Sequence, residues 1–281
     1  MASRPPPARP RSGAKAGEKP GATREQVERR ERFARARRES LRPAETDAPA
    51  ILYGWHTVTA ALRNPARHVR RLLATENAAR RLAEEGITVT PDVVRPSAID
   101  ERLLPDAVHQ GLYLEADPLP SPAIADLPAQ GIVLVLDQIT DPHNVGAIFR
   151  SAAAFAATAM VTTERHSPDA AGALAKAASG AIELVPLVTV QNLARALVEL
   201  RERGFLLVGL DSEGEADLAD LTLRAPLALV LGAEGKGLRQ LTRDTCDKLA
   251  RIDVPGEIKS LNVSNAAALS LYVASRALRR R

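Results

Sequence analysis

The sequence predicts an α/β fold in which a largely parallel sheet follows a smaller α/β unit. Short apolar runs of strand length, such as residues 131–136 and 227–231, alternate with longer segments that have the 3.6-residue period of helices. This alternation is typical of a parallel sheet with helices on both faces. Four prolines within residues 117–128 separate this pattern from the shorter elements before it.

The first unit, residues 50–117, contains short elements of both kinds. Its apolar spacing and its glycines and prolines predict, in order, a turn at 51–55, a helix at 56–63, a strand at 69–74, a helix at 76–85, a strand at 87–90, a helix at 97–104 and a strand at 109–115. Residues 118–129, which are rich in proline, are predicted to form a linker.

The second unit, residues 130–281, has a more regular alternation. It is predicted to contain strands at 131–136, 158–162, 184–188, 205–210, 227–231 and 249–254, and helices at 144–156, 169–177, 191–203, 238–246 and 263–279. In sheets of this kind, ligands bind at the carboxyl ends of the strands. A site is therefore expected in the loops after residues 136, 210, 231 and 254.

Positive charge is concentrated at the amino terminus of this 281-residue chain. The first 50 residues hold 13 basic and 7 acidic residues, whereas the remainder holds 25 basic and 27 acidic residues. Residues 1–49 are predicted to be a disordered tail rich in proline and arginine. Within this tail, residues 23–42 have the pattern of a helix that can form when the tail binds a polyanion. The tail either attaches the protein to nucleic acid or serves as a solvated segment that aids solubility.

Composition excludes several classes of protein. Cys246 is the only cysteine, so the chain cannot form an internal disulfide or a cysteine-rich zinc site, and we expect this thiol to be inert in the core. The five histidines lack the spacing of metal ligands, so we predict no metal. No apolar run approaches the roughly 18 residues of a membrane span, and the basic N-terminus does not resemble a secretory signal. We therefore expect a soluble, cytoplasmic protein that does not bind membranes.

The loop after residue 136 leads through Asp141-Pro-His-Asn144 into a predicted helix that contains Arg150. The Asn144 amide and the Arg150 guanidinium can hydrogen-bond a phosphate or a ribose beside the free N–H groups of the helix start. In the alternative interpretation, Asn144 caps the helix and Arg150 pairs with a carboxylate.

The loop after residue 231 reads Leu231-Gly-Ala-Glu-Gly-Lys-Gly-Leu238. Its glycines let the main chain approach a ligand closely, and the Glu234 carboxylate can accept a hydrogen bond from a hydroxyl or an amino group. The glycine spacing matches neither the phosphate-binding loop of NTPases nor the dinucleotide-binding fingerprint. The alternative is a simple turn between a strand and a helix.

The last polar loop concentrates Ser260, Asn262, Ser264 and Asn265 just before the final helix. Taken alone, these residues can be a helix cap with additional polar groups. Because the carboxyl ends of parallel strands meet at one edge of a sheet, the three loops together predict one shared site.

In order and spacing, residues 136–150, 229–238 and 260–266 resemble the three motifs of the SpoU/TrmH-type RNA ribose 2′-O-methyltransferases of the SPOUT superfamily. Through residues 53–62 and 107–112, the first unit is similar to the L30e-like substrate-binding domain of that family. Those two segments look most like the branch that methylates a guanosine in the peptidyl-transferase loop of 23S ribosomal RNA. The Arg-rich tail departs from the compact members of the family.

The resemblance implies a SPOUT fold whose C-terminal segment is threaded into a trefoil knot, a homodimer, and S-adenosylmethionine as the methyl donor. It places cofactor contacts at Leu210, Gly232, Ile252 and Leu261. It places roles in catalysis or in substrate positioning at Asn144, Arg150, Glu234, Ser260 and Asn262.

Methyl transfer to a ribose requires a group that takes the proton of the 2′-hydroxyl, and the resemblance points to Arg150. Because a guanidinium stays protonated in proteins, we expect Arg150 instead to bind the adjacent phosphate and lower the pKa of the hydroxyl, with Asn144 and Glu234 orienting Arg150 and the ribose. Two alternatives stay open. The protein can be a transfer RNA guanosine ribose methyltransferase of the same fold, or a non-catalytic protein that binds ribosomal RNA.

Overall fold

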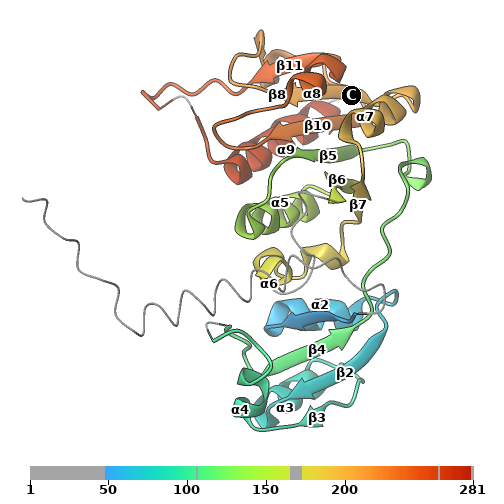
Figure 1. Cartoon of the computed structure of the whole chain (residues 1–281), viewed down its shortest axis with the longest axis vertical. Helices are drawn as coiled ribbons and strands as arrows, with labels where there is room; N and C mark the ends of the chain where they lie inside the picture. The colour runs from blue at the N-terminus through green and yellow to red at the C-terminus, as the bar shows by residue number, and fades with distance from the viewer. Residues whose placement is uncertain (1–47, 106, 165–172, 259, 280–281) are drawn as a thin grey trace, which may run out of the picture. The chain divides into compact units, whose positions relative to one another are not determined.

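Figure 1 shows the computed structural model of the chain, which describes residues 48–105, 107–164, 173–258 and 260–279. All of these residues belong to one structural unit, Ala44–Arg281. The tail predicted at residues 1–49, with its helix at 23–42, lies outside the described residues apart from its last two. The start of the helix predicted at 169–177 also lies outside them.

The first part of the chain forms a four-stranded sheet with the strand order β1-β4-β2-β3. Figure 1 labels β2, β3 and β4 of this sheet. Strand β4 (Leu112–Ala116) runs antiparallel to both β1 (Ala50–Tyr53) and β2 (Val69–Ala74), and the short β3 (Asp92–Val93) runs parallel to β2. The helices are α2 (Trp55–Arg63), α3 (Glu76–Glu84) and α4 (Pro96–Asp100). The strand predicted at 69–74 is confirmed with the same ends, and the three predicted helices and the strand predicted at 109–115 are confirmed with shifted ends.

Two predictions for this sheet are wrong. Residues 51–53, predicted as part of a turn, are the end of strand β1, because they pair with β4; the turn is confined to Gly54, whose φ is +87°. Residues 87–90 form no strand, because the Ile87 N–H bonds to the Leu82 carbonyl at 3.0 Å and so closes the end of α3. The chain joins the sheet only at Asp92.

The second part of the chain forms a seven-stranded sheet with the order β7-β6-β5-β10-β8-β11-β9, and all its pairings are parallel. Its strands are β5 (Ile132–Asp137), β6 (Ala159–Thr163), β7 (Leu187–Val190), β8 (Leu206–Leu210), β9 (Ala216–Asp217), β10 (Leu227–Gly232) and β11 (Lys248–Arg251). The six predicted strands and their parallel arrangement are confirmed. Strand β9 is not predicted, because a segment this short has no measurable periodicity.

The helices of this part are α5 (Pro142–Ala154), α6 (Ala173–Ala178), α7 (Leu193–Glu202), α8 (Gln240–Thr245) and α9 (Val263–Arg279), with turns of 3₁₀ helix at η1 (Ile124–Asp126), η3 (Ala181–Glu183) and η4 (Leu218–Asp220). Each predicted helix has a counterpart here. Helix α7 is shorter than predicted because Asn192 caps it, accepting a hydrogen bond from the Arg195 N–H at 3.1 Å. Within the described ranges, no helix combines the length and the hydropathy that crossing a membrane requires.

Both faces of the large sheet are buried, as expected for a parallel sheet between helical layers. Successive residues of a strand point to opposite faces, so Leu134 and Leu136 of β5 join one apolar cluster while Val133 and Val135 join another. The first cluster includes buried residues of α5 and α9, and the second includes those of α7. The sheet is therefore the centre of a three-layer arrangement.

The strand order brings four carboxyl ends together. The chain moves outward from β5 to β6 and β7, crosses back to β8, and later returns to insert β10 between β5 and β8. Strand β11 then pairs beside β8. Because these pairings are all parallel, the loops after β5, β8, β10 and β11 leave the same edge of the sheet, as predicted. Ligands in open α/β sheets bind where the winding direction changes in this way.

Candidate active site

The loop after β5 places Asn144 in the first turn of α5 without using its side chain as a cap. Asp141 caps the helix instead, because its carboxylate accepts a hydrogen bond from the His143 N–H at 3.2 Å, and Pro142 occupies the first helical position. The alternative in which Asn144 caps the helix is therefore wrong. Its amide reaches the loops after β10 and β11.

Asn262 links the three polar loops by hydrogen bonds. Its Nδ2 donates to Asn144 Oδ1 at 2.9 Å and to Glu234 Oε1 at 2.6 Å. Its Oδ1 accepts from the N–H and from the hydroxyl of Ser264, at 2.9 and 2.6 Å. The bond to the Ser264 N–H caps α9, so the interpretation of this loop as a helix cap is confirmed. Because both ends of the amide are engaged, its orientation is set by its partners.

Glu234 is held by one oxygen of its carboxylate. Oε1 accepts from Asn262 Nδ2 at 2.6 Å, from the Val263 N–H at 3.1 Å and from Asn144 Nδ2 at 3.4 Å. The carboxylate thus lies at the N-terminus of the 17-residue helix α9, where the helix dipole favours negative charge. Among the residues that the structure describes, Oε2 makes no hydrogen bond, so this oxygen is available to a ligand.

The glycine loop after β10 folds back on itself and carries Glu234 at its tip. Ala233 and Gly237 form an antiparallel bridge, in which the Gly237 N–H donates to the Ala233 carbonyl at 2.8 Å. Gly232 has no room for a side chain, because a Cβ there would lie 2.2 Å from the carbonyl carbon of Gly237. Gly235 and Gly237 have φ values of +74° and +65°, a conformation that favours glycine.

A second link between the loops, between Asp137 and Arg239, was not predicted from the sequence. Asp137, the fully buried last residue of β5, accepts hydrogen bonds from the Arg239 N–H at 3.0 Å and from Arg239 Nε at 2.7 Å. Arg239 immediately precedes α8, so this ion pair ties the end of the glycine loop to β5. A signal was present in the sequence, since Asp137 is a carboxylate placed directly after a continuous apolar strand.

A cavity of about 430 Å³ opens beside this network. All four residues predicted as cofactor contacts line it, namely Leu210, Gly232, Ile252 and Leu261. Glu234 and Ser260 line it as well. The cavity is also lined by Asp211 and Arg243, which form an ion pair at 2.6 Å. The cavity therefore combines apolar walls, exposed main chain and carboxylates at the edge where the four loops meet.

Arg150 is not brought to this network. Six residues of helix turn the side-chain direction by about 120° relative to Asn144 and advance it about 9 Å along the axis. Arg150 lines a different cavity, of about 570 Å³, together with residues of α2 and η3. Its guanidinium is exposed and makes no hydrogen bond or ion pair within the described residues, so the alternative of a carboxylate partner for Arg150 is not supported.

Two protein families match this chain. The SpoU rRNA Methylase family matches residues 131–272, which is the part that contains the seven-stranded sheet and all the site residues above. The family described as RNA 2′-O ribose methyltransferase substrate binding matches residues 51–122. The chain belongs to the SpoU rRNA methylase family.

Curated relatives within this SpoU family match nearly their whole length. The 23S rRNA (guanosine-2′-O-)-methyltransferase RlmB of Ralstonia nicotianae is 40% identical over 242 residues, which is 80% of this chain and 95% of the relative. The protein of the same name from Vibrio cholerae is 39% identical over 243 residues, or 80% of this chain and 96% of the relative.

Solved SpoU structures share the fold. The SpoU methyltransferase AviRb from Streptomyces viridochromogenes, in complex with the cofactor AdoMet, aligns with a TM-score of 0.70 at 24% identity, over 91% of this chain and 93% of that one. The AdoMet-bound rRNA methyltransferase from Sinorhizobium meliloti aligns with a TM-score of 0.70 at 22% identity, over 82% and 87%. The α/β fold expected from the resemblance is confirmed, and the trefoil knot stays a prediction.

Cys246, at the end of α8, is a poor candidate for a nucleophile in this SpoU chain. Its Sγ donates to the Thr242 carbonyl at 3.2 Å. Burial, followed by the nearby carboxylates of Asp247 and Asp137, raises the pKa of the Cys246 thiol to about 12. The thiol is therefore protonated at neutral pH, in agreement with the expectation that it is inert.

We expect Cys246 to react slowly with iodoacetamide in the folded protein at pH 8 and rapidly after unfolding in urea. With a folded-state pKa of about 12, on the order of one thiol in ten thousand is ionised at pH 8, compared with a substantial fraction when the pKa returns to about 8.5. Because the chain has one cysteine, total alkylation measured by mass spectrometry reports this residue alone. A folded-state rate that levels off near pH 9 would contradict the expectation.

Proposed function

We propose that this protein transfers a methyl group from S-adenosylmethionine to the ribose 2′-hydroxyl of a guanosine in 23S ribosomal RNA. The observation that carries the proposal is the hydrogen-bonded cluster of Asn144, Glu234 and Asn262. It comes from three separate segments and borders the cavity of about 430 Å³ through Glu234. A helix cap or a turn needs polar side chains from one segment only, whereas this cluster joins side chains from three.

The choice of substrate rests on the relatives. RlmB proteins from two organisms, named for 23S ribosomal RNA and for guanosine, match 80% of this chain and at least 95% of their own length. Both the part with the large sheet and the part with the small sheet have counterparts in the matching families. This breadth of similarity favours ribosomal RNA over the transfer RNA alternative.

The cavity suits S-adenosylmethionine, which supplies an electrophilic methyl group on a positively charged sulfonium and needs no metal. Leu210, Ile252 and Leu261 offer apolar surface for a flat base, and a volume of about 430 Å³ is typical of small-ligand sites. Gly232 keeps the main chain open where any side chain would strike the glycine loop. Arg243 already balances the charge of Asp211, whereas Glu234 on the same cavity wall has no basic partner among the described residues and can face a cationic group.

In the proposed reaction, the protein contributes mainly by positioning the ribose. Glu234 is anchored through Oε1, which leaves Oε2 to accept a hydrogen bond from a ribose hydroxyl. Asn144 and Asn262 hold that carboxylate in one orientation, and Ser260 adds a hydroxyl on the cavity wall. Fixing the reacting atoms about 3–3.5 Å apart accounts for much of the rate in reactions of this kind.

Arg150 has a separate task in this proposal. A guanidinium cannot act as the base, because it does not lose its proton in proteins. Its exposed side chain instead binds the phosphate next to the target ribose, so that the charge favours ionisation of the hydroxyl. As the methyl group leaves the sulfonium and bonds to the ribose oxygen, the hydroxyl proton passes to that phosphate, to water or to a neighbouring residue. The expectation that Asn144 and Glu234 orient Arg150 is dropped from the mechanism, since Arg150 has no contact with either within the described residues.

We further propose the division of the chain into a basic tail at 1–49, an RNA-binding domain at 50–117, a linker at 118–129 and a knotted methyltransferase domain at 130–281. The protein acts in the cytoplasm, where ribosomal RNA is found in bacteria, and the tail adds affinity for RNA through its charge.

Two copies form a homodimer through α9. In support, α9 exposes two large apolar side chains, since Leu269 and Tyr272 are 43% and 49% exposed.

The full chain, incubated with labelled S-adenosylmethionine and ribosomal RNA that lacks modifications, is expected to methylate the ribose of a single guanosine in 23S RNA. Nuclease digestion and mass spectrometry identify the nucleotide. Methylation of transfer RNA alone would replace the proposal with the transfer RNA alternative. Binding of ribosomal RNA without methyl transfer would support the non-catalytic alternative.

We expect the substitution Gly232→Ala to weaken S-adenosylmethionine binding by about tenfold or more, because overpacking costs about 1–3 kcal/mol and the added Cβ forces the glycine loop to move. Calorimetry measures the affinity, and a thermal melt checks that the variant folds. Gly256→Ala is the matched control, since a Cβ at Gly256 meets no atom within 4 Å. Equal affinities of the two variants would exclude this cavity as the cofactor site.

The substitution Arg150→Lys is expected to lower the single-turnover methylation rate by about a hundredfold, because an ammonium keeps the charge but loses the two-pronged geometry of the guanidinium. Affinity for S-adenosylmethionine stays unchanged, since Arg150 does not line that cavity. Arg201→Lys, at an exposed position on α7, controls for loss of a surface arginine. A normal rate in Arg150→Lys would refute the role given to Arg150.

A further inference from the structure

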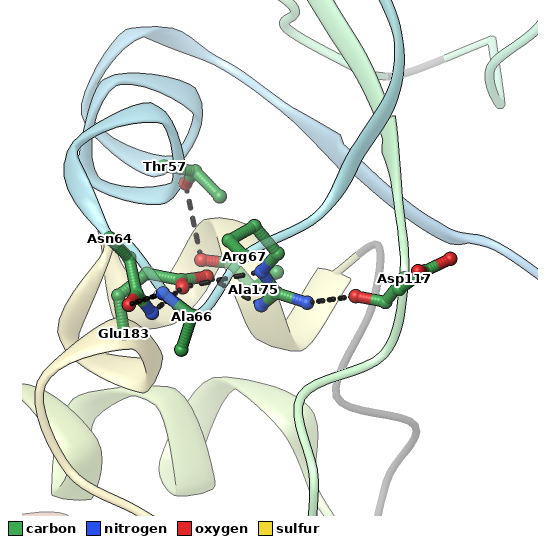
Figure 2. Close-up of polar contacts among 7 residues, drawn as sticks. All are labelled: Thr57, Asn64, Ala66, Arg67, Asp117, Ala175 and Glu183. Atoms are coloured by element: carbon green, nitrogen blue, oxygen red, sulfur yellow. Dashed lines mark hydrogen bonds and ion pairs between the residues drawn. The ribbon is translucent and has the colours of Figure 1, made fainter.

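A buried ion pair joins the small-sheet part of the chain to the large-sheet part. Arg67 follows α2, and Glu183 ends η3, 116 residues further along the chain. Arg67 Nη2 donates to Glu183 Oε1 at 2.6 Å, and Arg67 Nε donates to Glu183 Oε2 at 3.3 Å. Their side chains are only 2% and 3% exposed. Figure 2 shows the two side chains facing each other between α2 and the turn at η3.

The groups around the pair complete its hydrogen bonds (Figure 2). Arg67 Nη1 donates to the Asp117 carbonyl at 2.7 Å, which holds the strand that leaves the small sheet. Asn64 Nδ2 donates to Glu183 Oε2 at 2.7 Å. Nearby, the Thr57 hydroxyl donates to the Ala175 carbonyl of α6 at 3.2 Å. Four polar contacts from α2 and the loop after it therefore reach the large-sheet part at one place.

Tight packing accompanies these bonds. A Cβ at Gly180 would lie 2.5 Å from Ala60 Cβ and 3.0 Å from the His56 carbonyl, so α2 rests directly on main chain beside η3. Buried residues of the small sheet, such as Leu52, belong to the same apolar cluster as those of α5. A different orientation of α2 would open this contact and leave the ion pair uncovered.

Such a pair is better suited to setting geometry than to adding stability. Removing two charges from water costs roughly what their attraction returns, and an apolar pair of similar size often gives equal or greater stability. A two-pronged pair between a guanidinium and a carboxylate, in contrast, permits only a narrow range of mutual orientations. We therefore infer from their burial that Arg67 and Glu183 serve mainly to fix the orientation of the two parts of the chain that they join.

The pair also borders the cavity that Arg150 faces. Asn64 and Glu183 line that cavity of about 570 Å³ together with Arg150, Arg63 and Gly180. Any change in the orientation of α2 would alter the distance between the small-sheet part and Arg150. The pair is thus located where the RNA-binding part of the proposed enzyme meets an arginine proposed to bind the RNA backbone.

We propose that Arg67 is a positioning residue, whose buried pair with Glu183 sets the orientation of the substrate-binding part relative to Arg150. RNA held by the small-sheet part then reaches the methyl-transfer site with one ribose in place. This inference rests on the proposed function. It differs from a role in folding because orientation affects the rate of transfer to bound RNA, whereas folding affects only the amount of active protein.

The test compares the full-length double variant Arg67→Met/Glu183→Leu and the single variant Glu183→Gln with the wild type. The double variant replaces the pair by apolar groups of similar size, so the loss of stability is expected to be limited to that of the hydrogen bonds to the Asp117 carbonyl and from Asn64, and a thermal melt checks that the variant folds. We expect its single-turnover methylation of saturating ribosomal RNA to be slower by about tenfold or more, since small misplacements are costly in reactions that depend on positioning. Its affinity for S-adenosylmethionine and the fraction of active molecules stay unchanged.

Glu183→Gln keeps the shape of the partner but replaces one of its two accepting oxygens by an amide nitrogen, which only donates, and it leaves Arg67 without a counter-charge. We expect an intermediate rate. Asp92→Asn is the matched control, because it removes an exposed pair with Arg71 in the same sheet, and its rate should equal that of the wild type. Product mapping adds a second readout, since loss of orientation should spread methylation to neighbouring riboses.

A wild-type rate and a single product in the double variant would overturn the positioning role. A lower active fraction with an unchanged rate would overturn it too, because it would assign the pair to folding alone. Failure of the wild type itself to methylate ribosomal RNA would refute the proposed function instead, so the two failures are distinguishable.

Discussion

The insertion of β10 between β5 and β8 is the constraint on which the rest of the site depends. Its parallel pairing with both neighbours places the ends of β5, β10, β8 and β11 at one edge of the sheet. The polar residues at this edge come from segments up to 118 residues apart in the chain, as in the bond from Asn262 to Asn144. Without that strand order, each of these side chains would be a local cap or turn residue.

Two kinds of interaction then convert the shared edge into a defined site. The Asp137–Arg239 pair anchors the glycine loop to β5, and the N-terminus of α9 holds Glu234 through Oε1. The carboxylate is thereby fixed through one oxygen, whereas Oε2 accepts no hydrogen bond from the residues that the structure describes. The same loop forms one wall of the cavity that we propose for the cofactor, so a disturbance of the loop at Gly232 affects both the cavity and the carboxylate.

The parts predicted well are those with a local signal. The strands of the large sheet are continuous apolar runs, and their helices have clear periodicity, so both were expected within a few residues. The exceptions had other causes. Strand β1 depends on its pairing with β4, which is distant in the chain, and Ile87 bonds to the end of α3 instead of starting a strand. Among the site residues, Asn144, Glu234 and Asn262 were predicted from their loops and do meet, whereas Arg150 faces another cavity because a helix directs residues six apart to different sides.

The α/β class, the alternation of elements, the three polar loops and their resemblance to the SpoU family could all be predicted, because each of these is encoded by residues close together in the chain. Packing of distant segments fixes the rest: which oxygen of Glu234 accepts no hydrogen bond from the described residues, the bond of Asp137 to Arg239, and the meeting of Arg67 and Glu183 across 116 residues. Long-range pairs of this kind depend on how the layers pack. An arginine and a glutamate have no pattern in the sequence that distinguishes a buried partner from a solvated side chain.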